Sequence, residues 1–328
     1  MAFKDIAGNS RVKRILRRAL QRHRLPNSLL FSGPAGVGKT ATAVTVAKAL
    51  NCKAGKDDAC EECESCKAIE AGRFPDVLGI APEKEVIKIE QMRFIKQMAY
   101  LKPFSGTKRV FIVEQAEKMN EESANSLLKV LEEPPSFTHV ILVTSNPFLI
   151  LPTIRSRCQV LGFSNIGREE IERILAEQGY PEEQAKALSI IVGGNLEKAM
   201  GLDWNEVREK RQSAWGLFLS LLEEKGSLDF LSDFVFQQRA AAKDDFERTM
   251  EMFASVCRDI ILIKEHGESR FLLNPDLEEA LREAEGRWSL ERTQNCLVRT
   301  ESVLSGLSGN RNLNMNLQAA VYYSNFGE

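Results

Sequence analysis

The sequence predicts an α/β fold built on a parallel sheet, followed by an all-helical region. Short apolar runs rich in β-branched residues alternate with helical patterns over the first half of the chain. After about Phe163 the pattern changes to helical periodicity with long charged faces. Strands that alternate with helices are typical of doubly wound α/β domains. At 328 residues the chain is long enough for two or three domains.

The first expected element is an amphipathic helix over residues 11–24. Its apolar positions recur at helical spacing: Val12, Ile15, Leu16, Ala19 and Leu20. Its other face is basic, with Arg11, Lys13, Arg14, Arg17, Arg18 and Arg22. Two interpretations stay open, a solvated face or a surface that meets phosphates. The net charge of -2 does not favour general nucleic-acid binding, although it would hide a local basic patch.

Four apolar runs are expected to form buried strands, and helices are expected to connect them. The strands are predicted at residues 28–33, 76–80, 109–114 and 139–145. The helices are predicted at residues 39–50, 87–100 and 120–133. Pro134 and Pro135 end the last of these helices, because proline cannot continue a helix.

The helical region divides into a short and a long part. Residues 164–204 predict two or three short helices, broken at Gly179–Tyr180–Pro181 and at Gly193–Gly194. Residues 205–328 predict about five longer helices. The chain is therefore expected to form domains over residues 1–163, 164–204 and 205–328, with approximate boundaries.

The composition is that of a soluble globular protein, with 43% hydrophobic and 27% charged residues. No apolar run reaches the length of a membrane span, and the N-terminal residues lack the apolar core of a signal peptide. A cytoplasmic location is expected.

The stretch GPAGVGKT at residues 33–40 matches the phosphate-binding loop G-x-x-x-x-G-K-[ST] between a predicted strand and a predicted helix. Glycines let the backbone curl so that its N–H groups point at phosphate oxygens, and the following helix presents its N-terminal dipole. The lysine reaches the β- and γ-phosphates, and the threonine hydroxyl binds Mg²⁺. The expected nucleotide-binding residues are Gly33, Pro34, Gly36, Gly38, Lys39 and Thr40. They predict a site for ATP or ADP with Mg²⁺, since a chance glycine-rich turn does not explain the flanking elements.

Seven cysteines occur, and four of them crowd into residues 52–66. Cys52, Cys60, Cys63 and Cys66 have the spacing C-x7-C-x2-C-x2-C, which lets four thiolates converge on one zinc ion. An iron–sulfur cluster also accepts four cysteines, but nothing in the sequence indicates electron transfer. Cys257 and Cys296 lie in helical patterns and are expected to be buried apolar residues.

The phosphate loop, the four-cysteine insertion after its helix, ANSLLKVLEEPP (124–135) and TIRSRCQV (153–160) resemble the bacterial clamp-loader ATPases of the AAA+ class. The resemblance covers most of residues 1–200. It implies an AAA+ domain with a zinc module, a small helical lid over 164–204 and an oligomerisation collar over 205–328. It also implies partners: the motor (gamma/tau) and delta subunits of the DNA polymerase III holoenzyme, the sliding clamp and primed-template DNA.

The same resemblance implies roles for single residues. Arg157 matches the family's arginine finger, which reaches in trans into a neighbouring subunit's ATP site and stabilises the charge of the transferred phosphoryl group. An arginine that caps a helix or pairs with a carboxylate is the alternative. Thr144 and Asn146 fall where the family senses the γ-phosphate, although Asn146-Pro147 is also a turn signal.

Two departures from the family pattern bear on hydrolysis. A motor subunit has Asp-Glu where this chain has Glu114-Gln115, and glutamine cannot take a proton as a base, although it can orient a water. The family's lid arginine is replaced by Glu197, which would repel a triphosphate. Lys198 is adjacent, but successive helix positions point in different directions.

The sequence therefore favours a non-motor clamp-loader subunit that keeps the phosphate cradle, lacks ATP hydrolysis and has no polymerase site of its own. An ATP-hydrolysing gamma/tau-type motor is the alternative. A small-molecule kinase with a phosphate loop would leave the cysteine cluster, the Arg157 motif and the helical region unexplained.

Overall fold

The computed structural model describes residues 1–55, 57–222, 243–267, 272–274, 277–287 and 289–308. Contacts divide the chain into two compact units. One unit holds Met1–Gly179 and Val192–Met200, and the other holds Tyr180–Ile191 and Gly201–Glu328. The boundaries expected near residues 163 and 205 stay predictions, and parts of the expected collar lie outside the described residues.

The first unit is built on a sheet of five parallel strands. They are β1 (Ser28–Ser32), β2 (Val77–Ile80), β3 (Arg109–Val113), β4 (Thr138–Thr144) and β5 (Gln159–Gly162), in the order β2-β3-β4-β1-β5. The first four confirm the predicted strands. The sequence did not predict β5, because its residues QVLG hold only two apolar side chains, Val160 and Leu161, and an apolar run was the signal used.

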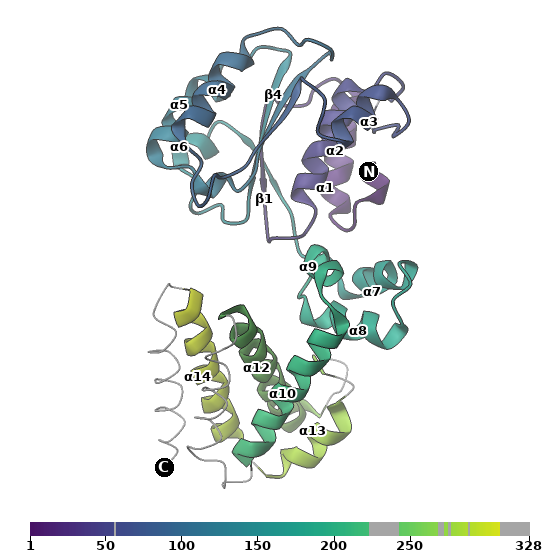
Figure 1. Cartoon of the computed structure of the whole chain (residues 1–328), viewed down its shortest axis with the longest axis vertical. Coiled ribbons are helices and arrows are strands. Elements are labelled where there is room, and N and C mark those ends of the chain that lie inside the picture. Colours follow the sequence, from purple (N-terminus) through teal and green to yellow (C-terminus); the bar gives the residue numbers. More distant parts are fainter. Residues whose placement is uncertain (56, 223–242, 268–271, 275–276, 288, 309–328) are drawn as a thin grey trace. The chain divides into compact units, whose positions relative to one another are not determined.

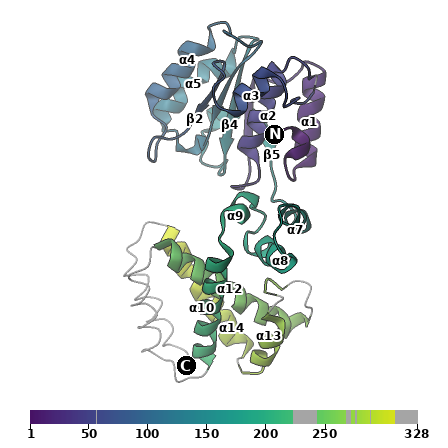
Figure 2. The same ribbon diagram turned by 45° about the vertical axis from the view of Figure 1, so that its right-hand side comes forward.

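Helices cover both faces of the sheet (Figures 1 and 2). The helices α1 (Ser10–Gln21), α2 (Lys39–Asn51) and α3 (Glu64–Glu70) lie on one face, and α4 (Ile89–Ala99), α5 (Glu121–Glu132) and α6 (Pro152–Arg155) lie on the other. Side chains alternate along each strand, so Leu29 and Phe31 pack toward α1 and α2, while Leu30 packs toward α4 and α5. Two apolar cores, one on each face, hold the sheet in place.

Helix ends follow local chemistry. The helix α1 ends at Gln21, three residues before the predicted end, and His23 after it is left-handed with φ 50°. The helix α5 begins after Asn120, whose Oδ1 accepts a hydrogen bond from the Ser123 N–H at 2.8 Å. The short 3₁₀ helices η1 (Phe3–Asp5) and η2 (Ala116–Lys118), and the helix α3, were not predicted.

Three short helices follow the sheet: α7 (Arg168–Glu177), α8 (Glu182–Ile191) and α9 (Leu196–Gly201). They confirm the two or three helices predicted for residues 164–204. Gly179, Gly193 and Gly194 between them all have positive φ, which explains why the helices break there.

The second unit has an apolar core of its own. Among its described residues are the helices α10 (Trp204–Leu222), α12 (Lys243–His266), α13 (Glu278–Glu285) and α14 (Leu290–Ser308). Phe253, Ile260 and Leu281 are central members of the core. Cys257 is fully buried, as predicted, and Cys296 is partly buried against the same core. None of the described helices is both long and apolar enough to cross a membrane.

Candidate functional site

The phosphate-binding loop lies where β1 ends and α2 begins. Gly33, Gly36 and Gly38 have φ values of 154°, 68° and 85°. A Cβ on Gly33 would lie 2.3 Å from the Phe163 carbonyl oxygen, and a Cβ on Gly36 would lie 1.7 Å from Asn195 Oδ1. Both positions therefore need glycine. In the described part of the chain no hydrogen bond occupies the backbone N–H of Gly36 or Gly38, so these groups are available to an anion.

Lys39 opens α2 and is only 7% exposed. Its Nζ donates to the Gly33 carbonyl oxygen at 2.6 Å and also to the Pro34 carbonyl oxygen. Burial lowers the pKa of Lys39, while the charges of Glu117 and Glu197 act in the opposite direction. The ammonium is thus held at the loop by the loop's own carbonyls, close to two carboxylates. Thr40 follows it in the first turn of α2.

The end of β3 carries Glu114 and Gln115 beside this loop. Burial raises the pKa of Glu114, and the nearby charge of Glu197 raises it further. The backbone of Gln115 has the left-handed conformation, with φ 47° and ψ 49°, which is uncommon for a residue other than glycine. The structure therefore brings Glu114, Lys39 and Glu197 into one electrostatic neighbourhood.

Glu117 is a site residue that sequence reasoning missed. Its Oε1 accepts hydrogen bonds from the Ser145 N–H at 3.2 Å and from the Ser145 hydroxyl at 2.5 Å, directly after β4. Burial alone would raise the pKa of Glu117, but hydrogen bonds from Ser145 and Thr144 lower it. The available signal was the position of Glu117 three residues after Glu114, at the edge of the sheet where parallel strands end.

The predicted γ-phosphate sensors lie at the same edge. Thr144 is fully buried, and its hydroxyl accepts a hydrogen bond from the Asn146 N–H at 3.1 Å. Asn146 Oδ1 accepts from the Phe148 N–H at 3.1 Å. This bond within the loop is the turn-forming role that was the alternative for Asn146.

Glu197 and Asn195 come from the segment that enters α9. Asn195 Oδ1 accepts the Lys198 N–H at 2.8 Å, which caps α9, and the same oxygen faces Gly36. The sequence does not single out Asn195, because its closeness to the phosphate loop depends on the tertiary fold.

Arg157 lies after α6 and away from the phosphate loop in the sequence. Its Nε donates to Glu132 Oε1 at 2.6 Å, its Nη2 also contacts Glu132, and its Nη1 donates to the Thr153 carbonyl oxygen at 2.8 Å. Within the isolated chain Arg157 thus caps α6 and pairs with a carboxylate. These contacts are compatible with a finger role, which requires a neighbouring subunit.

The four clustered cysteines converge. Their sulfur atoms all lie within 4.8 Å of one another, and the Cys52–Cys63 and Cys60–Cys66 Sγ distances are both 4.0 Å. Tetrahedral zinc with Zn–S bonds of about 2.3 Å needs sulfur separations of roughly 3.8 Å. The cluster therefore fits zinc after a small contraction.

Backbone N–H groups support this cluster. The Gly55 N–H donates to the Cys52 sulfur at 3.1 Å. The Cys63 N–H donates to the Cys60 sulfur, and the Cys66 N–H donates to the Cys63 sulfur, both at 3.4 Å. Such bonds stabilise thiolates, the form in which cysteine binds metal.

The loop that carries the cysteines holds the N-terminus. The Met1 amino group lies 2.5 Å from Glu61, and the fully buried Lys48 Nζ lies 3.0 Å from the same carboxylate. Asp58 Oδ1 accepts the Phe3 N–H at 3.0 Å. Sequence reasoning found no signal for these contacts, because they join residues more than ten positions apart.

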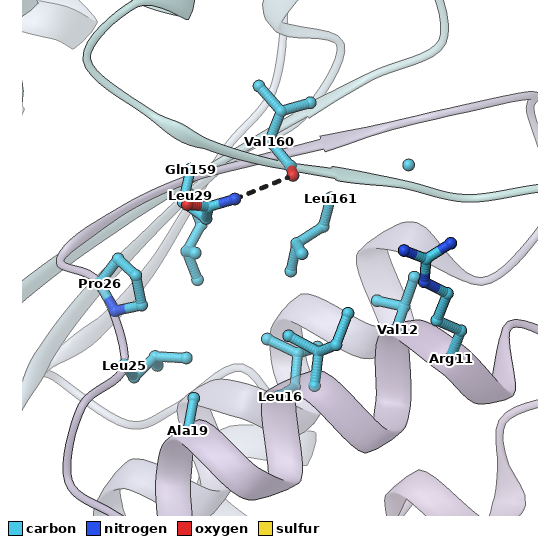
Figure 3. A pocket seen from close by; sticks show the side chains of 12 residues that line it. Arg11, Val12, Leu16, Ala19, Leu25, Pro26, Leu29, Gln159, Val160 and Leu161 are labelled. Atoms are coloured by element: carbon cyan, nitrogen blue, oxygen red, sulfur yellow. Dashed lines mark hydrogen bonds between the residues drawn. The ribbon is translucent and has the colours of Figure 1, made fainter.

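A groove of about 630 Å³ lies between α1 and the edge strand β5 (Figure 3). Side chains of α1, among them Val12 and Leu16, form one wall, and Val160 and Leu161 form the other.

Arg17 on the basic face of α1 pairs with Asp57 at 2.7 Å. Both interpretations of that face, solvated or phosphate-facing, stay open.

Comparisons with known proteins point to one family. The sequence model of the family described as DNA polymerase III, delta subunit, matches residues 8–167. The DNA polymerase III subunit delta' of Bacillus subtilis is 30% identical over 308 residues, which are 94% of this chain and 91% of the relative.

Two further comparisons concern the gamma/tau proteins. The tau/gamma subunit of Haemophilus influenzae is 31% identical over 240 residues, 70% of this chain but 35% of the relative. A solved structure of a gamma subunit-related protein from Thermotoga maritima covers 94% of this chain and 98% of its own, with a TM-score of 0.46 and 20% identity.

Proposed function

The chain belongs to the family of DNA polymerase III subunits that contains delta' and gamma/tau, and on that premise we propose that it is a delta'-type clamp-loader subunit without ATP hydrolysis. Its match to a delta' relative extends over 94% of the chain and therefore into the helical region. The match to a tau/gamma relative covers 70% of this chain. The wider coverage of this chain by the delta' match supports the delta' type over the motor type.

We infer the absence of ATP hydrolysis from the charged side chains around Lys39. Hydrolysis of a bound triphosphate needs a metal-holding carboxylate, a residue that activates water and positive charge at the γ-phosphate. Here Gln115 stands at the water-activating position, and Glu197 brings negative charge near Glu114 and Lys39. The cradle is thus suited to hold a nucleotide, ATP or ADP with Mg²⁺ on Thr40, without completing the reaction.

In this proposal the chain acts on its neighbours. Arg157 enters the ATP site of an adjacent gamma/tau motor subunit and stabilises the charge that develops on the phosphoryl group. Residues 164–204 form the lid, and residues 205–328 form the collar that joins the chain to the motor and delta subunits. The assembly loads the sliding clamp on primed-template DNA in the cytoplasm, and any polymerase activity resides in other subunits.

We also propose that the cysteine cluster binds one structural zinc ion. The four thiolates would hold the ion in a closed site with no open position for a substrate. The ion would stiffen the loop between α2 and α3. The convergence of the four sulfur atoms supports this role.

Steady-state ATP turnover of the purified chain tests the proposal directly. We expect none above background, alone or with DNA. Turnover near 1 s⁻¹, a common enzyme rate, that disappears in the variant Lys39→Ala would overturn it. The second candidate, a gamma/tau-type motor, predicts that result, and the open N–H groups of the phosphate loop and the carboxylate of Glu114 favour it.

A further inference from the structure

The guanidinium of Arg157 is held by residues of two helices before any partner arrives. Glu132 is the last residue of α5, and its Oε1 accepts the Nε–H of Arg157 at 2.6 Å. The Thr153 carbonyl oxygen in α6 accepts an Nη1–H at 2.8 Å. A third, longer contact joins Nη1 to the Ser156 hydroxyl at 3.4 Å.

These contacts leave part of the guanidinium open. The group has five N–H bonds in a planar fork. Glu132 Oε1 faces the edge formed by Nε and Nη2, while Nη1 faces the Thr153 carbonyl oxygen and, at a longer distance, the Ser156 hydroxyl. Among the described residues no second acceptor reaches Nη2, so its other N–H can donate to a phosphate oxygen. The surroundings therefore orient the guanidinium and leave this N–H open.

The two helices that supply these contacts are fixed to the sheet. Leu131, the neighbour of Glu132, and Ile154, the neighbour of Thr153, are buried in the same apolar core. Pro134 and Pro135 stop α5 just after Glu132, so its carboxylate stands at a defined helix end. A carboxylate on a rigid element limits the positions of its partner more than one on a loop does.

Stability does not explain the pair. The side chains of Arg157 and Glu132 are 32% and 46% exposed. Exposed ion pairs typically contribute about 0.2–1 kcal/mol. The pair therefore adds little to the stability of the folded chain, so its loss in a variant can be tested without unfolding the chain.

We propose that Glu132 is a positioning residue for Arg157, which orients the guanidinium for the phosphoryl group in the neighbouring subunit's site. The proposal rests on the finger role of Arg157 proposed above. Orientation matters because a misplacement of about 1 Å near a reacting centre can reduce a rate by roughly 100-fold. In this proposal Glu132 acts through Arg157, which is the residue that its carboxylate contacts.

The test measures the ATP turnover that the full-length chain adds to its purified gamma/tau-type motor partner. We expect Arg157→Ala to abolish this increment. Glu132→Ala should lower the kcat of the increment roughly 10-fold with an unchanged KM for ATP, because binding is left intact while orientation is lost. Glu132→Gln keeps an acceptor oxygen toward Nε and should lose less.

Glu133→Ala is the matched control, since Glu133 is the adjacent exposed carboxylate and makes no ion pair among the described residues. It should leave kcat unchanged. Thermal unfolding should be the same for all four variants to within the small effect of an exposed pair.

The outcomes separate the two proposals. If Arg157→Ala abolishes the increment and Glu132→Ala leaves it unchanged, the finger role stands and the positioning role is wrong. If Glu132→Ala raises the increment, Glu132 restrains the finger rather than orienting it, which also overturns the inference. If Arg157→Ala has no effect, both proposals fail.

Discussion

His139 is a titratable base enclosed in the sheet of the first unit. It lies in β4 and is 3% exposed, and its Nδ1 lies 3.3 Å from the Pro26 carbonyl oxygen. No hydrogen-bond partner reaches its Nε2 among the described residues. Burial lowers the pKa of His139 to about 4, against the weaker opposing effect of the Pro26 carbonyl. The folded chain therefore holds this imidazole neutral at pH 7.

The first prediction at the residue scale concerns acid stability. Because the folded pKa of about 4 lies below the ordinary 6.5, the folded chain binds fewer protons than the unfolded chain between these values. The contribution of His139 to the free energy of unfolding is fully present above pH 6.5. It is lost as the pH falls toward 4, by up to about 3 kcal/mol. Urea unfolding at pH 7 and pH 4.5 should show a smaller loss for His139→Phe. An equal loss in wild type and variant would contradict the assignment.

The residues around the phosphate loop show what a sequence can and cannot predict at this scale. One contiguous motif contains Gly33, Gly36 and Lys39, and the spacing of its residues predicts the loop geometry directly. Glu117 and Asn195 complete the same site from segments after β3 and before α9. Their types are common at turns and caps, so only the fold distinguishes them from ordinary loop residues.

At the scale of elements, the cysteine loop does more than contribute four sulfur atoms. Glu61 lies between two of the cysteines and carries the ion pairs to the Met1 amino group and to Lys48 of α2. Asp58 fixes the Phe3 N–H. The N-terminal segment then runs to Ile6, whose side chain lies beside Gly38 of the phosphate loop. If the cluster binds zinc as proposed, the metal should order the segment that lies beside the glycine-rich loop at residues 33–40.

The second prediction follows from this connection. Elemental analysis should find about one zinc ion per wild-type chain, and Cys63→Ser should lose it. Amide hydrogen exchange at Phe3 should become faster in Cys63→Ser, because the acceptor Asp58 moves with the loop. Cys158→Ser is the control, since Cys158 is buried outside the cluster and should retain zinc. Unchanged zinc content in Cys63→Ser would refute the ligand assignment.

Strands were predictable where a continuous apolar run marks them, and this includes β2, of whose residues only Ile80 is buried. The strands β1, β3 and β4 are buried along their whole length and were found from apolar runs. The edge strand β5 has one buried residue, and its pairing with β1 gives no periodic signal in the sequence. The helix α3 is short, and its ends are set by the cysteine loop rather than by its own pattern.

At the scale of the whole molecule, the chain has separate apolar cores in its two units. The cores on the two faces of the sheet belong to the first unit, and the core around Phe253 and Ile260 belongs to the second. The boundaries that the sequence predicts near residues 163 and 205 stay predictions. The sequence did not indicate that Val192–Met200, which brings Asn195 and Glu197, groups with the sheet while the preceding helix α8 does not.

The last prediction uses these separate cores to test nucleotide binding. Separate cores should unfold in more than one thermal transition, because cooperativity is limited between units. A ligand that binds only the folded first unit stabilises it by about 2.7 kcal/mol at 100 times its Kd. Differential scanning calorimetry with ADP and Mg²⁺ should therefore raise one transition and leave the other in place. Lys39→Ala should abolish the shift, since the ammonium at Gly33 is then missing. A shift of equal size in Lys39→Ala would mean that the nucleotide binds elsewhere, and no shift in wild type would mean that the cradle is unused.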